Sequence, residues 1–358
     1  MPVKLGLIGA GGIANFHAEI ASKVGLKIVA VCDIDEKRAN SLVDTYQGAI
    51  ATTNVDELLA NSNVQAVAIT TPNATHKPLA IAALEAGKDV LVEKPMAINS
   101  AEADELVEAA KNSKQILQIG FVCRYAPASI AAKKYVDSGM LGKIYHVKAN
   151  LNRRRGIPGL GRWFTNKSQS GGGVLMDLGV HLLDLALHIT GHPKPERVSA
   201  SCTSTFGSPI SSYCYNEMWA GPPNAKGVFD VEDAVTALLR FHGGMTLELN
   251  TSWAAEIPSG VIKDGLLLLG DKGGCFFDLW ANELTLAHEI QGQLVETKQQ
   301  FPSDDAWEAS WKRQYEVFLD NITKRKAPTA SVEDGRAVQL LLDALYASSE
   351  QGCEIAVG

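Results

Sequence analysis

Short, continuous apolar runs alternate with segments of helical periodicity in the first third of the chain. The apolar runs show no polar alternation, which is typical of parallel strands buried on both faces of a sheet. We predict strands at residues 3–8, 27–32, 49–51, 66–70, 90–93 and 116–121. The segments between them predict helices at residues 13–24, 36–46, 54–60, 74–86 and 99–112. This order predicts an α/β domain with a parallel sheet covered by helices on both faces.

The pattern changes after residue 124. A helix at 129–137, a strand at 143–151 and a very apolar helix at 174–190 precede a region of consecutive predicted strands. These strands lie at residues 198–206, 212–219, 234–241, 246–253, 266–269, 275–279 and 284–287. Strands without intervening helices predict a large, open, mostly antiparallel sheet. We therefore predict two domains, 1–124 and 125–358, the second an α+β domain whose C-terminal helices could pack back on the first.

The first strand runs into a glycine-rich turn that opens the first helix. Gly9, Gly11 and Ala14 fit the pattern G-x-G-x-x-A. The first position permits a tight turn, the second lets backbone approach a pyrophosphate, and the third lets helix and strand pack closely. Asp33 follows the second strand, where a ribose-binding acid is expected. We predict a Rossmann dinucleotide site that includes Gly9, Gly11, Gly12, Ile13 and Asp33.

Composition and charge narrow the possible partners and compartments. The 358-residue chain carries a formal net charge of -7 and has a pI near 5.7. This acidic balance argues against nucleic acid or an anionic membrane as the main partner. We find no apolar run long enough to span a bilayer and no signal peptide ahead of the first strand. The six cysteines form no C-x-x-C pair, so we expect reduced thiols in a cytoplasmic protein, with a Cys202–Cys214 disulfide as the alternative.

Three polar stretches are candidates for chemistry. Two follow predicted Rossmann strands, at the sheet edge where open α/β sheets bind ligands. The first contributes Thr71, Pro72, Asn73 and His76, and the second is Glu93-Lys94-Pro95. The third begins with Gly171-Gly172-Gly173 and continues through Asp177, Gly179, His181 and Asp184 in the apolar helix. We expect the first two stretches to bind cofactor.

The chain resembles the Gfo/Idh/MocA oxidoreductase family, named for glucose–fructose oxidoreductase and inositol dehydrogenase. The resemblance rests on three motifs and their order: the N-terminal glycine motif, Glu93-Lys94-Pro95, and the segment from Gly171-Gly172-Gly173 through Asp177, Gly179, His181 and Asp184. The resemblance covers nearly the whole chain. It implies a nicotinamide cofactor and a sugar or cyclic polyol (inositol-like) substrate. It also implies that Lys94, Asp177 and His181 match the catalytic lysine, aspartate and histidine of the family.

The residue chemistry agrees with that role. Oxidation of a secondary alcohol requires a base for the hydroxyl proton, and histidine is the side chain that titrates near neutral pH, so we assign His181 as the base. Asp177 lies four residues earlier, on the same face of a regular helix, where it could orient the imidazole. Lys94 could donate a hydrogen bond to the substrate oxygen and stabilise a developing alkoxide.

Structural alternatives remain open at this stage. Glu93-Lys94-Pro95 could simply end a strand, and His181 could be a satisfied core histidine. Asp177, His181, Asp184 and His188 form one helical stripe that could supply half of a metal site. We predict no metal, because no second ligand cluster stands out in the sequence.

Substrate contacts are expected from residues that follow strand ends or precede the apolar helix. The candidates are Arg124, Tyr125, Arg155 and Trp163, together with Asp177 and His181. A solvated basic loop is an equally good explanation of the arginines. An aromatic residue beside arginines that bind hydroxyl groups would suit a sugar.

The sequence therefore predicts an NAD-dependent dehydrogenase of a sugar, sugar derivative or cyclic polyol. Lys37 and Arg38 lie near Asp33 and leave NADP possible. The rival functions are an NAD-dependent glycoside hydrolase that oxidises its substrate transiently, and a non-catalytic NAD(P)H-binding sensor. We also expect a homo-oligomer, dimer or tetramer, built through the C-terminal sheet.

Overall fold

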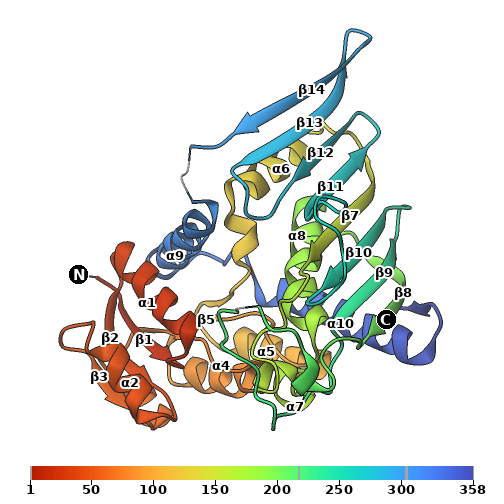
Figure 1. The fold of residues 1–358 in the computed structure, drawn as a ribbon. Coiled ribbons are helices and arrows are strands. Elements are labelled where there is room, and N and C mark those ends of the chain that lie inside the picture. Colours follow the sequence, from red (N-terminus) through yellow and green to blue (C-terminus); the bar gives the residue numbers. More distant parts are fainter. Residues whose placement is uncertain (1, 217, 303–304, 358) are drawn as a thin grey trace. The chain divides into compact units, whose positions relative to one another are not determined.

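The computed structural model describes residues 2–216, 218–302 and 305–357. The chain divides into two compact units (Figure 1). Unit 1 comprises Met1–Phe121 and Trp311–Gln339, and unit 2 comprises Val122–Ser310 and Leu340–Gly358. A segment from near the C-terminus therefore completes the N-terminal unit.

Unit 1 is built on a six-stranded sheet in which every pairing is parallel. The strand order is β3-β2-β1-β4-β5-β6. The strands are β1 (Lys4–Ile8), β2 (Lys27–Cys32), β3 (Ile50–Thr52), β4 (Ala66–Ile69), β5 (Asp89–Val92) and β6 (Leu117–Ile119). This confirms the predicted doubly wound sheet. The order reverses between β1 and β4, and ligands of such sheets bind outside the carboxyl ends of the strands at that point.

The helices of unit 1 follow the predicted alternation. They are α1 (Gly12–Lys23), α2 (Glu36–Val43), α3 (Val55–Ala60), α4 (His76–Glu85), α5 (Ser100–Asn112) and the part of α9 (Ala306–Lys324) that begins at Trp311. The side chains of Asn54 and Asn99 cap α3 and α5 by accepting from backbone N–H groups. Most boundaries lie within one residue of prediction. The larger differences are that α2 ends at Val43 instead of residue 46, and that a 3₁₀ turn, η1 (Asn73–Thr75), precedes α4.

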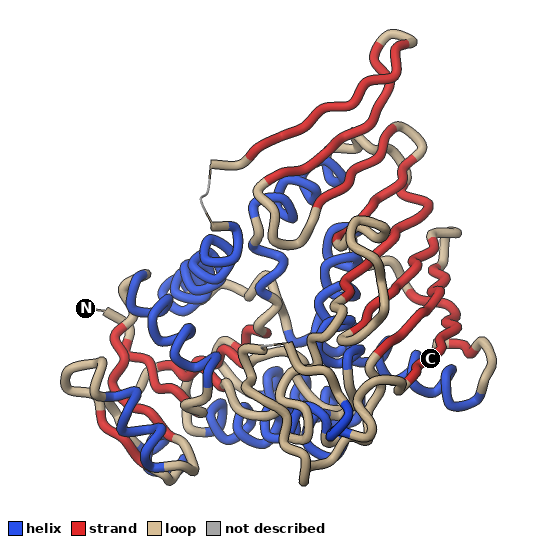
Figure 2. The backbone as a smooth tube through the Cα atoms, in the orientation of Figure 1, coloured by secondary structure: helices blue, strands red, loops and turns tan. Residues whose placement is uncertain are grey.

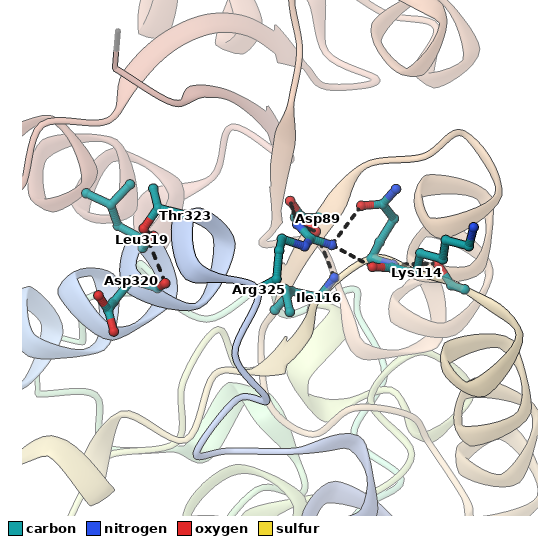
Figure 3. Close-up of polar contacts among 9 residues, drawn as sticks. Asp89, Lys114, Ile116, Leu319, Asp320, Thr323 and Arg325 are labelled. Carbon is teal, nitrogen blue, oxygen red and sulfur yellow. Dashed lines mark hydrogen bonds and ion pairs between the residues drawn. The ribbon is translucent and has the colours of Figure 1, made fainter.

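An ion pair joins the returning segment to the sheet of unit 1 (Figure 3). Arg325 follows α9, and its Nη1 donates to both carboxylate oxygens of Asp89, at 3.0 and 2.8 Å. Its Nη2 donates to the carbonyl of Lys114 and to Oε1 of Gln115. Asp89 begins β5 and also accepts the N–H of Ile116 at 2.7 Å. One buried carboxylate thus connects α9 to the starts of β5 and β6.

Unit 2 contains a nine-stranded sheet, visible as the longer set of strands in Figure 2. Its order is β14-β13-β12-β11-β7-β10-β9-β8-β15, and every pairing is antiparallel except β7 with β10. The strands are β7 (Ile144–Asn152), β8 (Pro195–Thr203), β9 (Ala234–Phe241), β10 (Thr246–Ser252), β11 (Gly265–Gly270), β12 (Gly273–Phe277), β13 (Glu283–Ile290), β14 (Gln293–Gln300) and β15 (Ile355–Ala356). The predicted mostly antiparallel sheet is confirmed.

The strand predicted at residues 212–219 was wrong, and strands β14 and β15 were not predicted. Residues 212–216 and 218–219 form no strand; a 3₁₀ turn, η5 (Ile210–Ser212), begins this region, and residue 217 lies outside the described residues. Strand β14 was missed because its sequence, QLVETKQQ, is largely polar and mostly exposed. An edge strand that is solvated on both faces carries no apolar pattern, and backbone pairing with β13 holds it.

The apolar helix of unit 2 packs against the sheet. The predicted helix at 174–190 begins as a π-helical turn, η4 (Leu175–Gly179), and continues as α8 (Val180–Thr190). In Figure 1, α8 and α6 (Pro127–Asp137) lie along the same sheet. The helical stretch Lys167–Thr190 is in fact long and apolar enough to cross a membrane, but 83% of its apolar window is buried inside the protein. This corrects the sequence prediction, and burial identifies a core helix.

Candidate functional site

The glycine turn of unit 1 has the geometry that a dinucleotide site requires. Gly9 has a φ of +100°, and a Cβ there would lie 3.0 Å from the backbone of Thr70. Its N–H donates to the carbonyl of Cys32 at 2.8 Å, which closes the turn. A Cβ at Gly11 or Gly12 would meet no described atom within 4 Å. Open space therefore lies in front of the α1 N-terminus, where no described side chain caps the helix, and this arrangement fits a pyrophosphate.

Asp33 is fixed beside this turn. Its Oδ2 accepts the N–H of Ala10 at 2.7 Å, and its Oδ1 accepts the N–H of Asp35 at 2.8 Å. A carboxylate has about four lone-pair sites, so further hydrogen bonds from ribose hydroxyls remain possible. Arg38, which could have favoured a 2′-phosphate, lies 3.4 Å from the carboxylate of Asp35.

His76 connects the two predicted cofactor-binding loops. It begins α4 and is 1% exposed. Its Nδ1 lies 2.7 Å from the carbonyl oxygen of Pro95, and its Nε2 lies 2.8 Å from that of Thr71. Both carbonyls could accept hydrogen bonds only if the ring were protonated. The two carbonyls raise the pKa of His76, but burial has the larger effect and lowers it. The ring is therefore neutral; it donates to one carbonyl and packs against the other.

The carboxylate of Glu93 belongs to a relay, a chain of hydrogen bonds that runs from Tyr315 through His17 to Glu93 and Lys94. Its Oε1 lies 3.1 Å from Nε2 of His17, whose Nδ1 lies 2.7 Å from the hydroxyl of Tyr315. Burial raises the pKa of Tyr315 well above its ordinary value, so the phenol keeps its proton. The phenol can then donate to Nδ1, while Nε2–H donates to Glu93. The other oxygen of Glu93 accepts the N–H of Lys94 at 3.2 Å, so the relay ends at the predicted catalytic lysine.

Unit 2 presents Asp177 and His181 from adjacent helical segments. Asp177 lies in the π turn η4, and its Oδ2 accepts from Nε1–H of Trp253 at 2.9 Å. His181 lies in the first turn of α8, with Nδ1 3.4 Å from Sγ of Cys123. Both are half-buried, whereas Trp253 and Cys123 are buried. In a π-helical turn the backbone hydrogen bond joins residues five apart, instead of four apart as in an α-helix. The four-residue separation of Asp177 and His181 therefore makes less than a full turn where the chain passes through η4.

Arg124 and Asp184 form a buried ion pair next to this helix. Nε of Arg124 donates to both carboxylate oxygens of Asp184, at 3.0 and 2.9 Å, and each side chain is 1% exposed. Arg124 lies in a 3₁₀ turn, η2 (Val122–Tyr125), beside Cys123. Tyr125, the second substrate candidate of this turn, is also buried. The ion pair holds η2 against α8, close to His181.

The remaining substrate candidates lie in loops of unit 2. The guanidinium of Arg155 stacks over the ring of Phe206 at 4.7 Å and pairs with the carboxylate of Glu256. Trp163 stacks on Phe164, with 3.7 Å between ring centroids, and Phe164 meets the exposed Trp219 edge to face. Trp163 therefore belongs to an aromatic cluster near the surface.

Among the described residues, no group of three or more His, Cys, Asp or Glu side chains could hold a metal ion. The stripe considered for a metal contains Asp184, whose carboxylate is instead paired with Arg124. The six cysteines are all free, so the alternative Cys202–Cys214 disulfide is not formed.

Several supporting residues had no signal in the sequence. Trp253 and Cys123 contact candidate residues from distant positions in the chain, and Tyr315 contacts His17, the partner of Glu93. None of the three belongs to a motif recognised in the sequence, so only its tertiary contact distinguishes it.

Two protein-family models match this chain. Residues 3–121 match the model described as "Oxidoreductase family, NAD-binding Rossmann fold", and residues 130–276 match the GFO/IDH/MocA C-terminal domain. D-glucoside 3-dehydrogenase of Escherichia coli (strain K12) is 32% identical over 99% of this chain and 97% of its own length. Myo-inositol 2-dehydrogenase of Thermotoga maritima is 27% identical over 98% and 97%.

Solved structures show the same fold. Levoglucosan dehydrogenase in complex with NADH and levoglucosan superposes with a TM-score of 0.85 at 21% identity, over 100% of both chains. GenD2 from gentamicin A biosynthesis, in complex with NAD, gives a TM-score of 0.81 at 26% identity, over 100% of this chain and 97% of its own. With both domains matched and a full-length relative above 30% identity, this chain belongs to the GFO/IDH/MocA oxidoreductase family and carries its NAD-binding Rossmann domain.

Proposed function

We propose that this protein uses NAD to oxidise a secondary hydroxyl group of a sugar, a sugar derivative or a cyclic polyol. The supporting observation is that two half-buried polar side chains, Asp177 and His181, lie on one helical segment. Contacts from Trp253, from Cys123 and from the buried Arg124–Asp184 pair hold this segment in place. Full-length similarity to proteins named D-glucoside 3-dehydrogenase and myo-inositol 2-dehydrogenase supports the substrate class.

The residues of unit 1 fit NAD. Backbone N–H groups at Gly11, Gly12 and Ile13 would hold the pyrophosphate, and Asp33 would accept the adenosine ribose hydroxyls. When bound, the nicotinamide supplies the hydride acceptor. Thr71, Pro72, Asn73 and His76 would line the cofactor site beyond β4.

The chemical roles follow from the side chains. His181 removes the hydroxyl proton while the hydride leaves the same carbon, so the alcohol becomes a carbonyl. Lys94 donates a hydrogen bond to the substrate oxygen as negative charge develops on it. Asp177, held by Trp253, orients substrate or imidazole.

The loops of unit 2 are proposed to shape the substrate site. Arg155 and Trp163 suit hydroxyl groups and the apolar face of a sugar ring. Because Arg124 and Tyr125 are buried, we assign them to support of α8 instead of direct contact with substrate.

A substrate and cofactor panel tests the function. Methyl glucosides, glucose, levoglucosan and myo-inositol are each incubated with NAD or NADP, and NADH absorbance and carbonyl product are measured. We expect stoichiometric NADH and ketone from at least one compound, with NAD preferred and the preference relaxed in Asp33→Ser. Glycosidic cleavage without NADH release would support the hydrolase. NAD binding without turnover of any compound would support the sensor.

We also propose a cytoplasmic homo-oligomer assembled through the sheet of unit 2. Leu267 and Phe276 pair across β11 and β12 and point away from the helices, since their neighbours Leu266, Leu268 and Phe277 are buried in the core. An apolar outer sheet face of this kind is suited to burial against a second subunit.

A further inference from the structure

The three-glycine run ahead of the catalytic helix makes room for other parts of unit 2. Gly171 ends α7 (Lys167–Ser170) with a φ of +80°. A Cβ at Gly172 would lie 2.0 Å from the hydroxyl oxygen of Tyr346, and one at Gly173 would lie 1.9 Å from the carbonyl oxygen of Glu232. The second and third glycines therefore allow Tyr346 and Glu232 to approach the backbone.

Glu232 uses this approach to cap the start of the π turn. It is 8% exposed. Its two carboxylate oxygens lie 3.0 and 2.9 Å from the N–H of Gly173, and its Oε1 accepts the N–H of Leu175 at 2.9 Å. The hydroxyl of Tyr346 donates to the same Oε1 at 2.9 Å. The first N–H groups of a helix have no partner within the helix, so a buried carboxylate satisfies them and favours this start point.

The backbone of Glu232 adds a second hold on the same turn. Its carbonyl accepts the N–H of Val174 at 3.2 Å, so three consecutive residues, 173–175, bond to one glutamate. The N–H of Asp177 then donates to the carbonyl of Gly173 at 3.1 Å. The position of Asp177 is therefore set one hydrogen bond away from the glutamate.

The next residue fixes the side chain of Asp177 by a different route. The carbonyl of Asp233 accepts the N–H of Trp253 at 2.8 Å, and Nε1–H of Trp253 donates to Asp177. The side chain of Asp233, which is fully buried, accepts the N–H groups of Thr205, Phe206 and Gly207. Residues 232 and 233 together hold both the backbone and the carboxylate of Asp177.

We propose that Glu232, assisted by Tyr346, is a positioning residue that sets the start and rotation of the π turn and hence the places of Asp177 and His181. This role rests on the proposed function, because it supposes that those two side chains act on substrate. Burial raises the pKa of Glu232, and the donors from Leu175, Gly173 and Tyr346 oppose that rise. An amide at this position would present an NH₂ group to N–H donors, which is unfavourable whatever the charge.

The test compares Glu232→Gln and Tyr346→Phe with Glu296→Gln, a matched control on the exposed β14 edge strand. We expect kcat of Glu232→Gln to fall by roughly tenfold to a hundredfold, the usual cost of small misplacement. NAD affinity should stay unchanged, because the residues that fit NAD lie in unit 1. Amide hydrogen exchange over residues 173–182 should become faster, while exchange over β4 and β5 stays the same.

Tyr346→Phe removes one hydroxyl group and should show the same pattern more weakly, so it carries the test if Glu232→Gln fails to fold. Unchanged exchange and unchanged kcat in both variants, relative to Glu296→Gln, would overturn the proposal. If wild type oxidises no compound in the panel, the proposed function fails, and hydrogen exchange alone decides whether Glu232 sets the turn.

Discussion

At the scale of single residues, the candidate side chains are defined by the partners that orient them. Asp177 accepts from an indole N–H, and His181 lies beside a thiol. An indole has a single N–H, so it occupies only one of the acceptor sites of the aspartate carboxylate. The two residues are therefore held by different groups, and their substitutions should have different consequences.

His181→Ala should lose roughly a hundredfold or more in turnover, which is the usual share of a general base. The fall of kcat/KM at low pH should disappear with it, because that limb reports protonation of the base. Asp177→Asn should be milder, since an amide oxygen can still accept from Trp253. Kinetics across pH for the three proteins provide the measurement. A His181→Ala enzyme with near-wild-type turnover and an unchanged profile would refute the assignment.

His76 gives stability a definite pH dependence. Burial lowers its pKa in the folded protein, so just below the ordinary value of about 6.5 the unfolded chain binds more protons. The stability that the neutral ring contributes is present above that pH and is lost as the pH falls through the folded pKa. Urea midpoints of wild type should therefore fall more steeply below pH 6.5 than those of His76→Gln.

His242→Gln, at an exposed histidine, is the control for the loss of an imidazole outside the buried site. If the urea midpoint of wild type instead rose relative to that of His76→Gln as the pH falls, the ring of His76 would be protonated in the folded protein. The two carbonyls at Thr71 and Pro95 would then hold a doubly donating imidazolium.

At the scale of elements, the helix that carries Asp177 and His181 is central to unit 2. Its apolar residues pack in the core, while polar side chains hold it from outside: Glu232 at its start, Trp253 along the π turn and Arg124 beyond His181. Apolar contacts are non-directional, so they specify the rotation and register of a helix less sharply than hydrogen bonds do. Directional bonds of this kind fix one register, which suits the role proposed for Asp177 and His181.

Breaking the Arg124–Asp184 pair should be costly. Arg124→Met removes the guanidinium that pairs with the buried carboxylate of Asp184 on α8, and we expect a loss of about 3–5 kcal/mol in the free energy of unfolding. The double variant Arg124→Met/Asp184→Leu should recover much of that loss, because no charge then remains buried. Urea unfolding of the two single variants and the double variant measures the coupling. Additive losses would show that the two side chains do not depend on each other.

At the scale of the whole molecule, assembly is the main prediction. Light scattering at micromolar concentration should give a mass above the 38.3 kDa of one chain. Leu267→Arg should lower that mass without changing NAD affinity, because the substitution places a charge on the outer sheet face of unit 2. Glu296→Gln on β14 again serves as the control. A monomeric wild type would contradict the prediction.

The amino-acid sequence by itself determined the parts of this protein that depend on local pattern. The strands of the parallel sheet, of which all but β3 are largely buried, the helices between them and the glycine turn at Gly9 are encoded within short windows. Burial on both faces of a sheet requires unbroken apolar runs. The motifs around Lys94 and His181 were equally local, and so was the family resemblance. The polar edge strand β14 left no such pattern and was missed.

Only the tertiary structure decided which residues support the motifs. Trp253 lies 76 positions from Asp177, Asp184 lies 60 from Arg124, and Tyr315 lies 298 from His17. Nothing in a local window distinguishes these residues from ordinary core positions, because their roles arise from a single long-range hydrogen bond or ion pair. The glycine run shows both sides of this. Its pattern was visible in the sequence, but its reason, the approach of Glu232 and Tyr346, exists only in the folded chain.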